Sequence, residues 1–257
     1  MRTPFVAANW KMNTDSVDAA TLAGAVARSC GQRRDVEVLL CPPFPYLPAV
    51  RTALAGTRIE LGGQNCYCEP KGAYTGEVSP QMLRDVGCKW VLVGHSERRH
   101  IFGEKNEFLR KKISAAEAAG LRVIYCVGET MAQRQDKQTE SVVGEQLDSG
   151  LPDVAPEAWA NVVVAYEPVW AIGTGVNATP EQAEAVHQFV RHWLEARAGN
   201  AISQATRILY GGSVNARNAG ALAAQANVDG FLVGGASLIA EDFQAIVAAM
   251  ATARTAN

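Results

Sequence analysis

The sequence has no excess of charge of either sign. Its 257 residues include 24 lysines and arginines against 26 aspartates and glutamates, which gives a formal net charge of −2. A chain with this balance has no overall electrostatic attraction to nucleic acid or to an anionic membrane surface. We therefore expect no nucleic-acid partner, and any site for an anionic ligand must be built from local groups.

Motifs for metal binding and for membrane insertion are also missing. The six cysteines include no CxxC pair, and Cys66 and Cys68 form the only close pair, whereas a zinc ribbon needs two pairs at matched spacing. We predict no metal, and reduced, buried thiols typical of a cytoplasmic protein. No apolar run approaches the roughly 20 residues that cross a bilayer, and MRTPF at the start lacks an apolar signal segment. We therefore expect no membrane association.

What the chain does contain is eight short apolar runs separated by longer segments of helical pattern. Most of these runs are continuous rather than alternating, which is typical of strands buried on both faces of a parallel sheet. The runs are 5–8, 36–40, 59–61, 90–93, 123–127, 162–165, 208–210 and 231–233.

Helix starts are recognisable between these runs. Ser79-Pro80 and Thr179-Pro180 each place a capping residue before a proline at the first helical position, and Gln182 completes a capping box. Neither a linker nor a charge block divides the chain. Eight strand–helix units in one domain, 1–257, predict an α/β fold with a closed parallel (β/α)8 barrel. An open doubly wound sheet is the alternative.

Polar and glycine residues follow five of the predicted strands. In a barrel the carboxyl ends of all strands open on one face, where active sites lie. Taken singly, a histidine after a strand is often structural, a loop lysine is normally solvated and a glycine pair is normally a tight turn. Their convergence on one face favours a site. The segments are Asn9-Trp10-Lys11, Gly94-His95-Ser96-Glu97, Glu167, Gly211-Gly212-Ser213 and Gly234-Gly235-Ala236-Ser237.

The two glycine loops follow the seventh and eighth strands, a position that frequently holds phosphate in barrels. Small residues let backbone N–H groups approach an anion, so we expect a phosphate-bearing ligand. Residues 173–178 also fit the dinucleotide fingerprint G-x-G-x-x-G/A. The glycines there do not follow the strand directly, and the next helix signal begins only at Thr179, so the setting of that motif is missing.

Seven motifs in order resemble the triosephosphate isomerase family, along nearly the whole chain. They are NWKMN (9–13), AYTGEVS (73–79), VGHSERR (93–99), CVGE (126–129), AYEPVWAIGTG (165–175), YGGSVN (210–215) and DGFLVGGA (229–236).

The resemblance implies the fold called the TIM barrel and the interconversion of dihydroxyacetone phosphate and glyceraldehyde 3-phosphate, without cofactor or metal. It implies that Glu167 is the base that moves a proton between neighbouring carbons, dried by the uncharged flap 169–172. His95 would polarise the carbonyl while a helix beginning at residue 96 keeps the imidazole neutral, an assignment for which this family is a standard worked example. Lys11 would supply positive charge and Asn9 a hydrogen bond.

Further expectations concern binding and assembly. Gly173, Ser213, Gly234 and Gly235 would bind the phosphate, and residues 168–173 would form a lid that protects the enediolate from phosphate elimination to methylglyoxal. Glu97 would orient Lys11 or form a plain surface ion pair, and Cys126 would support packing. By resemblance, loop 64–77 inserts into a twin subunit with Thr75 near the partner's site, so we expect a homodimer.

Two other functions remain open on the residues alone. One is a different phosphate-binding barrel enzyme, such as an aldolase, although a Schiff-base lysine would lie within a strand and be desolvated, whereas Lys11 follows a strand. The other is a non-catalytic binding barrel, which predicts the loss of at least one of Lys11, His95 and Glu167. All three are present.

Overall fold

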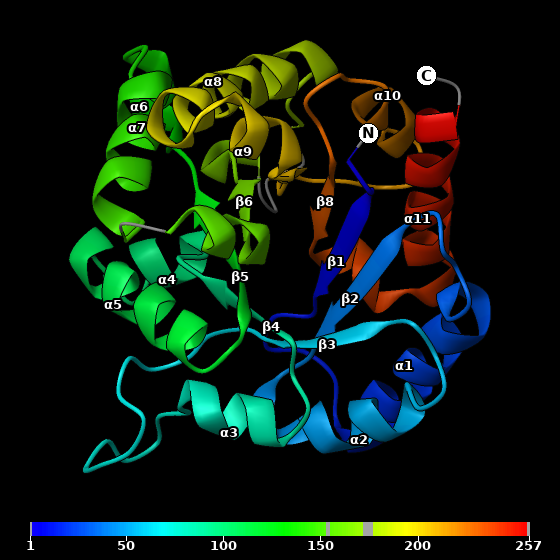
Figure 1. Cartoon of the computed structure of the whole chain (residues 1–257). Coiled ribbons are helices and arrows are strands. Elements are labelled where there is room, and N and C mark those ends of the chain that lie inside the picture. Colours follow the sequence, from blue (N-terminus) through cyan, green and yellow to red (C-terminus); the bar gives the residue numbers. More distant parts are fainter. Residues whose placement is uncertain (1, 153–154, 172–176, 256–257) are drawn as a thin grey trace.

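A computed structural model describes residues 2–152, 155–171 and 177–255. Eight parallel strands close into a barrel in sequence order, with β1 paired to both β2 and β8. All eight predicted strands form, within two residues of the predicted bounds, and the closed barrel is confirmed (Figure 1). The strands are β1 (Phe5–Asn9), β2 (Glu37–Cys41), β3 (Glu60–Gly63), β4 (Trp90–Val93), β5 (Arg122–Val127), β6 (Val162–Tyr166), β7 (Ile208–Tyr210) and β8 (Gly230–Val233).

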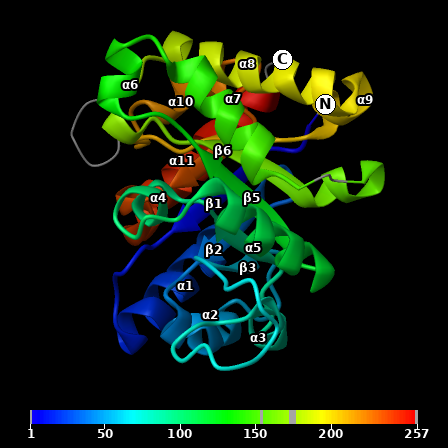
Figure 2. The same cartoon turned by 90° about the vertical axis from the view of Figure 1, so that its left-hand side faces the viewer.

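Helices surround the barrel on all sides (Figure 2). The α-helices are α1 (Ser16–Cys30), α2 (Leu47–Ala53), α3 (Pro80–Asp85), α4 (Ser96–His100), α5 (Asn106–Ala118), α6 (Met131–Gln135), α7 (Thr139–Gly150), α8 (Pro180–Ala198), α9 (Asn200–Ala205), α10 (Ala219–Ala223) and α11 (Ala240–Thr255). Four 3-10 turns complete the described elements: η1 (Phe44–Tyr46), η2 (Pro156–Asn161), η3 (Val169–Ala171) and η4 (Gly235–Leu238).

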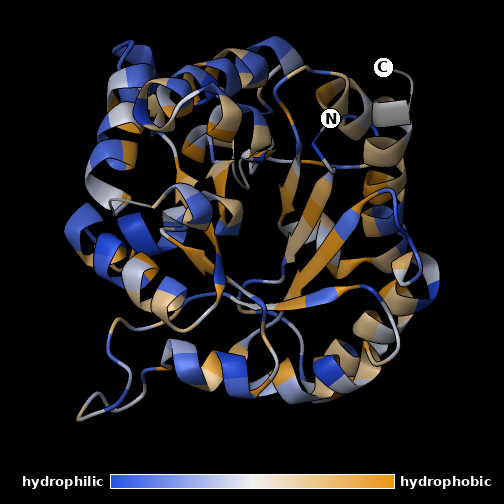
Figure 3. Ribbon diagram, in the orientation of Figure 1, coloured by the Kyte–Doolittle hydropathy of each residue, from blue (hydrophilic) through white to orange (hydrophobic). Residues whose placement is uncertain are grey.

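Strand side chains point alternately into the barrel and out toward the helices. Phe5 and Ala7 belong to the cluster inside the barrel, whereas Val6 and Ala8 belong to the larger cluster between strands and helices. Both faces are covered, which explains why the strands read as continuous apolar runs (Figure 3). Closure between β1 and β8 needs a glycine, because a Cβ at Gly230 would lie 1.8 Å from the backbone oxygen of Phe5.

The predicted helix starts are confirmed in detail. The Ser79 side chain accepts from the backbone N–H of Met82 at the start of α3. Thr179 and Gln182 form the reciprocal capping box of α8. These caps satisfy N–H groups that have no partner inside the helix, and they fix where the helices begin relative to the strands they cover.

A fully buried histidine on α8 makes the fold sensitive to acid. The His187 ring packs against the rings of Tyr166 and Tyr210, with centroids 6.0 Å and 6.4 Å away. Its Nδ1 contacts the backbone oxygen of Asn227 at 3.0 Å, and its Nε2 has no partner among the described residues. Burial lowers the pKa of His187 from 6.5 to about 4. The neutral form is therefore the one that the fold accommodates.

We expect this histidine to lower stability as the pH falls from about 6.5 toward 4. In that window the unfolded chain takes up a proton at residue 187 and the folded chain does not. The free energy of unfolding therefore falls, by about 3 kcal/mol once the pH is below 4. Urea unfolding of His187→Gln, which keeps a donor for Asn227, should show a shallower acid limb. His192→Gln, at an exposed position of α8, serves as the control. Equal acid limbs for His187→Gln and the parent protein would refute this origin.

Candidate active site

A cavity of about 430 Å³ opens at the carboxyl ends of the strands. The structure places seven of the sequence-predicted residues around it, at the ends of five strands that are distant in sequence. They are Asn9, Lys11, His95, Glu167, Ser213, Gly234 and Gly235. Of the remaining predicted residues, Glu97 contacts Lys11, Cys126 lies in the buried cluster inside the barrel, Thr75 lies in an exposed loop, and Gly173 is outside the described residues.

The Glu167 carboxylate is buried and held by two donors. It is the first residue after β6 and is 2% exposed. One oxygen, Oε2, accepts from the backbone N–H of Ser96 at 2.9 Å, and the other, Oε1, lies 3.1 Å from Nε2 of His95. Gly211 makes room for this side chain, because a Cβ there would lie 2.8 Å from Cγ of Glu167. A buried carboxylate so placed can act as a base once its donors let it move.

His95 is the N-cap residue of α4, directly before its first residue, Ser96. Its Nδ1 accepts from the backbone N–H of Glu97 at 3.3 Å, so that nitrogen carries no proton. The ring proton of the neutral imidazole is therefore on Nε2, which faces Glu167 and the cavity. The cap itself thus selects the tautomer that can donate a hydrogen bond to a ligand oxygen.

Lys11 has an unusual backbone conformation beside the cavity. Its φ of 53° lies in the left-handed region, which costs a non-glycine residue on the order of 1 kcal/mol. Asn9 Oδ1 accepts the Lys11 N–H at 3.0 Å, and Gln64 donates to the Lys11 carbonyl at 2.8 Å. The ammonium is 2.7 Å from Glu97 Oε1. The N–H and the carbonyl of Lys11 are thus both held by hydrogen bonds, and its ammonium is paired with a carboxylate.

The glycine loops lie next to this ammonium. A Cβ at Gly234 would be 3.4 Å from Cε of Lys11, and Gly234 directly precedes the turn η4. Ser213 differs from the simple expectation of a free anion donor: its Oγ and its backbone N–H both donate to the Ala171 carbonyl, at 2.7 Å and 3.3 Å. Binding of an anion by Ser213 would require this contact with Ala171 to give way.

It was not predicted from the sequence that the buried carboxylate of Glu129 holds the turn η3 in place. Trp170 is 8% exposed and donates from Nε1 to Glu129 Oε1 at 2.9 Å, and Tyr166 donates to the same oxygen at 3.1 Å. Arg134 pairs with this fully buried carboxylate at 3.2 Å. The described part of the flap, η3, is therefore a buried, anchored turn and not a loose cover. In the sequence, Glu129 is the last residue of the CVGE motif, and no other signal marks it.

Cys126 lies directly under the site, fully buried. Burial, and secondarily the negative charge of Glu167, raises the pKa of its thiol well above the ordinary value. The thiol therefore stays protonated and apolar in character, which suits the packing role expected from the sequence. Within the described ranges, no three His, Cys, Asp or Glu side chains are grouped as a metal site would require, and no helix is long and apolar enough to cross a membrane.

Comparisons with known proteins agree with this geometry. The family model described as triosephosphate isomerase matches residues 4–250. A protein of Roseiflexus sp. (strain RS-1) named triosephosphate isomerase is 50% identical over 247 residues, 96% of this chain and 97% of its own. Proteins of that name from Carboxydothermus hydrogenoformans and Dictyostelium discoideum are 50% and 44% identical, covering 96% of this chain and 98% and 95% of theirs.

Proposed function

We propose a catalytic or binding role for each polar side chain of the cavity. The chain belongs to the triosephosphate isomerase family. The protein is an aldose–ketose isomerase of glycolysis that interconverts dihydroxyacetone phosphate and D-glyceraldehyde 3-phosphate. The reaction takes a C–H proton beside a carbonyl and returns it to the neighbouring carbon. It requires one base, one donor to the two oxygens, and a hold on the phosphate. The observation that carries the proposal is the single cavity that gathers Glu167, His95 and Lys11.

Glu167 is the base in this proposal. Its two oxygens contact the backbone N–H of Ser96 and Nε2 of His95. A substrate carbonyl that accepts from Nε2 of His95 would replace Oε1 in that contact and release the carboxylate toward the substrate. The carboxylate then removes the proton, the electron pair of the C–H bond moves into an enediolate, and the same carboxylic acid returns the proton to the adjacent carbon.

His95 acts on the oxygens. Because Nδ1 accepts from the helix N–H, the imidazole is neutral and presents N–H at Nε2. This donor stabilises the charge that develops on the carbonyl oxygen and can pass its proton to the enediolate, then recover one from the second hydroxyl.

Lys11 and the glycine loops hold the substrate's negative charge. Lys11 supplies a fixed ammonium, and Asn9 has its Oδ1 used by Lys11 N–H, which leaves its amide Nδ2 for the substrate. The phosphate is proposed to bind at Ser213, Gly234 and Gly235, beside Lys11, together with Gly173. A phosphate there would take the place of the Ala171 carbonyl as acceptor for Ser213, which links phosphate binding to a shift of Ala171.

A coupled assay tests the function directly. With dihydroxyacetone phosphate as the only substrate, a chelator present and no cofactor added, we expect glyceraldehyde 3-phosphate to form, and a downstream dehydrogenase can report it. Release of inorganic phosphate without aldehyde would indicate elimination, and absence of both products would contradict the function.

We also propose that the active protein is a homodimer. Three large apolar side chains near Lys11 and α4 are exposed: Met12 is 95%, Ile101 74% and Phe102 67% exposed. Nine successive residues, 69–77 with Thr75 among them, are exposed in a segment that projects from the barrel between β3 and α3 (Figure 1). Apolar exposure of this kind marks an interaction surface, and a second copy with two-fold symmetry would cover it on both subunits.

The dimer predicts a defined effect of a charge at this surface. Phe102→Asp should dissociate the protein at micromolar concentration and lower turnover roughly tenfold or more, because exposed Met12, the residue after Lys11, would lose the cover of the second copy. Met131→Asp adds the same charge at an exposed apolar residue of α6 and should leave the dimer intact. Sedimentation equilibrium gives the oligomeric state of the parent protein and both variants, and turnover is measured on the same samples. A parent protein that sediments as a fully active monomer would contradict the proposal.

Two general properties complete the proposal. Six free cysteines, five of them buried, suit the reducing cytoplasm. One domain, 1–257, is supported by the single closed barrel, whose strands come from residues 5 to 233. A single cooperative unfolding transition that follows both the barrel tryptophans and the helices would test the one-domain assignment.

A further inference from the structure

A second hollow lies at the end of the barrel opposite the catalytic cavity. Its volume is about 400 Å³. It is lined by residues that begin strands, Glu37 of β2, Glu60 of β3 and Arg122 of β5, and by residues of the loops that lead from helix to strand, among them Arg34 and Arg58. These are the amino ends of the strands, whereas the catalytic cavity uses the carboxyl ends.

The charged side chains that line this hollow are four arginines and two glutamates. Both carboxylates already have cationic partners. Glu60 pairs with Arg122 and also accepts from Nε1 of Trp90 at 2.5 Å. Glu37 pairs with Arg207, whose guanidinium stacks on the ring of Phe5. Neither glutamate is therefore available to neutralise a further arginine.

The positive charge that remains is on two arginines. Arg33 pairs with Asp35 at 2.6 Å within its own loop. Arg34 and Arg58 are exposed, and among the described residues their side chains have neither an ion pair nor a hydrogen bond. Two guanidinium groups thus border one hollow with their donors unused, in a chain whose net charge is −2.

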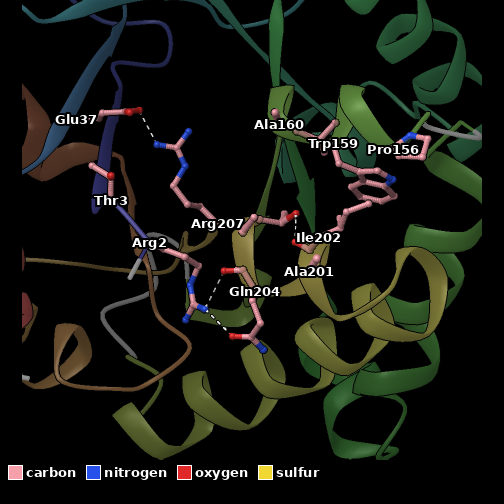
Figure 4. Close-up of a pocket in the computed structure, with 13 residues that line it drawn as sticks. Arg2, Thr3, Glu37, Pro156, Trp159, Ala160, Ala201, Ile202, Gln204 and Arg207 are labelled. Carbon is pink, nitrogen blue, oxygen red and sulfur yellow. Dashed lines mark hydrogen bonds and ion pairs between the residues drawn. The ribbon is translucent and has the colours of Figure 1, made fainter.

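In a larger cavity beside this hollow, both lining arginines already have polar partners. It measures about 700 Å³ and shares Thr3 and Glu37 with the hollow. Figure 4 shows its two arginines directed at neighbouring polar groups: Arg207 toward Glu37, and Arg2 toward Gln204. Arg2 is also paired with Asp229 at 2.6 Å. An anion there would have to displace existing partners. Of these two cavities, only the smaller is lined by arginines without partners among the described residues.

We propose that the hollow lined by Arg34 and Arg58 binds a small dianionic or polyanionic molecule that carries two phosphoryl groups. The planar guanidinium donates two parallel hydrogen bonds to a phosphoryl group, and two such forks select a ligand with two groups over a monophosphate. A volume of about 400 Å³ admits a molecule of that size. The site lies apart from the catalytic cavity and shares no residue with it.

Calorimetric titration with inorganic pyrophosphate at low ionic strength tests the site. The Arg34→Gln/Arg58→Gln variant removes the two unused guanidiniums. The matched control, Arg28→Gln/Arg84→Gln, removes two exposed arginines from α1 and α3 and leaves the same net charge. We expect the parent protein and the control to bind pyrophosphate alike at this site, and the first variant to bind it there at least tenfold more weakly.

Isomerase kinetics separate this site from the active site. Pyrophosphate that enters the catalytic cavity appears as competitive inhibition, which all three proteins should show equally, with unchanged kcat and KM for the triose phosphate. Equal pyrophosphate titrations for all three proteins would overturn the site. Inorganic monophosphate binding as tightly as pyrophosphate to the parent protein would overturn the two-phosphoryl class. Neither result depends on whether the isomerase assignment holds.

Discussion

Glu167→Asp should lower turnover on the order of a hundredfold while the protein stays folded. The substitution keeps a carboxylate but shortens the side chain by one methylene, so the oxygen retreats by roughly 1 Å from the position where it meets a substrate proton. Glu167 reaches Ser96 N–H at 2.9 Å and His95 at 3.1 Å, and an aspartate cannot keep both contacts from the same backbone. The measurement is kcat in the coupled assay, in both reaction directions.

The matching affinity measurement shows whether chemistry or binding is lost. Affinity for inorganic phosphate, which competes at Lys11 and the glycine loops, should change much less than kcat. Near-normal turnover in Glu167→Asp would remove this residue from the base role. A fall in affinity as large as the fall in turnover would instead indicate a collapsed cavity.

His95→Gln should lower turnover by about a hundredfold to ten-thousandfold, the range of a positioned acid–base group. The amide can still donate one hydrogen bond to the carbonyl oxygen, but it cannot give up a proton to one oxygen and recover it from the other. The loss should appear mainly in kcat, because Lys11, Gly234 and Gly235 still hold the phosphate.

Two controls separate this effect from damage to α4, because Nδ1 of His95 also caps that helix. The melting temperature of His95→Gln reports the lost cap. His100→Gln removes an exposed imidazole from the end of the same helix and should stay close to full activity. If His95→Gln keeps more than a tenth of the parent turnover, proton transfer between the oxygens does not need the imidazole.

The barrel could be predicted from sequence because its signals are local. Strands buried on both faces leave continuous apolar runs, and caps such as Ser79 and Thr179 mark helix starts by residue type alone. The rule that strand carboxyl ends share one face then placed Lys11, His95 and Glu167 together without coordinates. Topology converts their separation in sequence into proximity, and the structure has them around one cavity.

The contacts that set the chemistry were not predictable, because they involve backbone groups and side-chain directions. No residue type signals that Ser96 donates its N–H to Glu167, or that Nδ1 of His95 accepts from the helix and thereby fixes the tautomer. The same holds for Ser213, whose hydroxyl is turned to the Ala171 carbonyl. A serine after a strand looks the same whether its hydroxyl is free or already bonded.

The exposed apolar side chains after α4 and the contact between Glu129 and Trp170 were not predicted either, for a related reason. Ile101 and Phe102 follow a short helix, and their residue types do not indicate that they are exposed. Glu129 and Trp170 meet through tertiary packing across 41 residues of sequence, and periodicity carries no information about such pairs. Burial of a single polar atom is a property of the assembled fold.

We claim that Glu167 removes the substrate proton, and hydrogen–deuterium exchange into the substrate is the measurement that decides it. Dihydroxyacetone phosphate is incubated with the parent protein and with Glu167→Gln in deuterium oxide, and deuterium at the hydroxymethyl carbon of the recovered substrate is measured by NMR. The parent protein should introduce deuterium, and Glu167→Gln, with an amide of the same shape that cannot accept the proton, should introduce none above the protein-free rate. Exchange by a folded Glu167→Gln protein at the parent rate would contradict the claim and assign the proton transfer to another group.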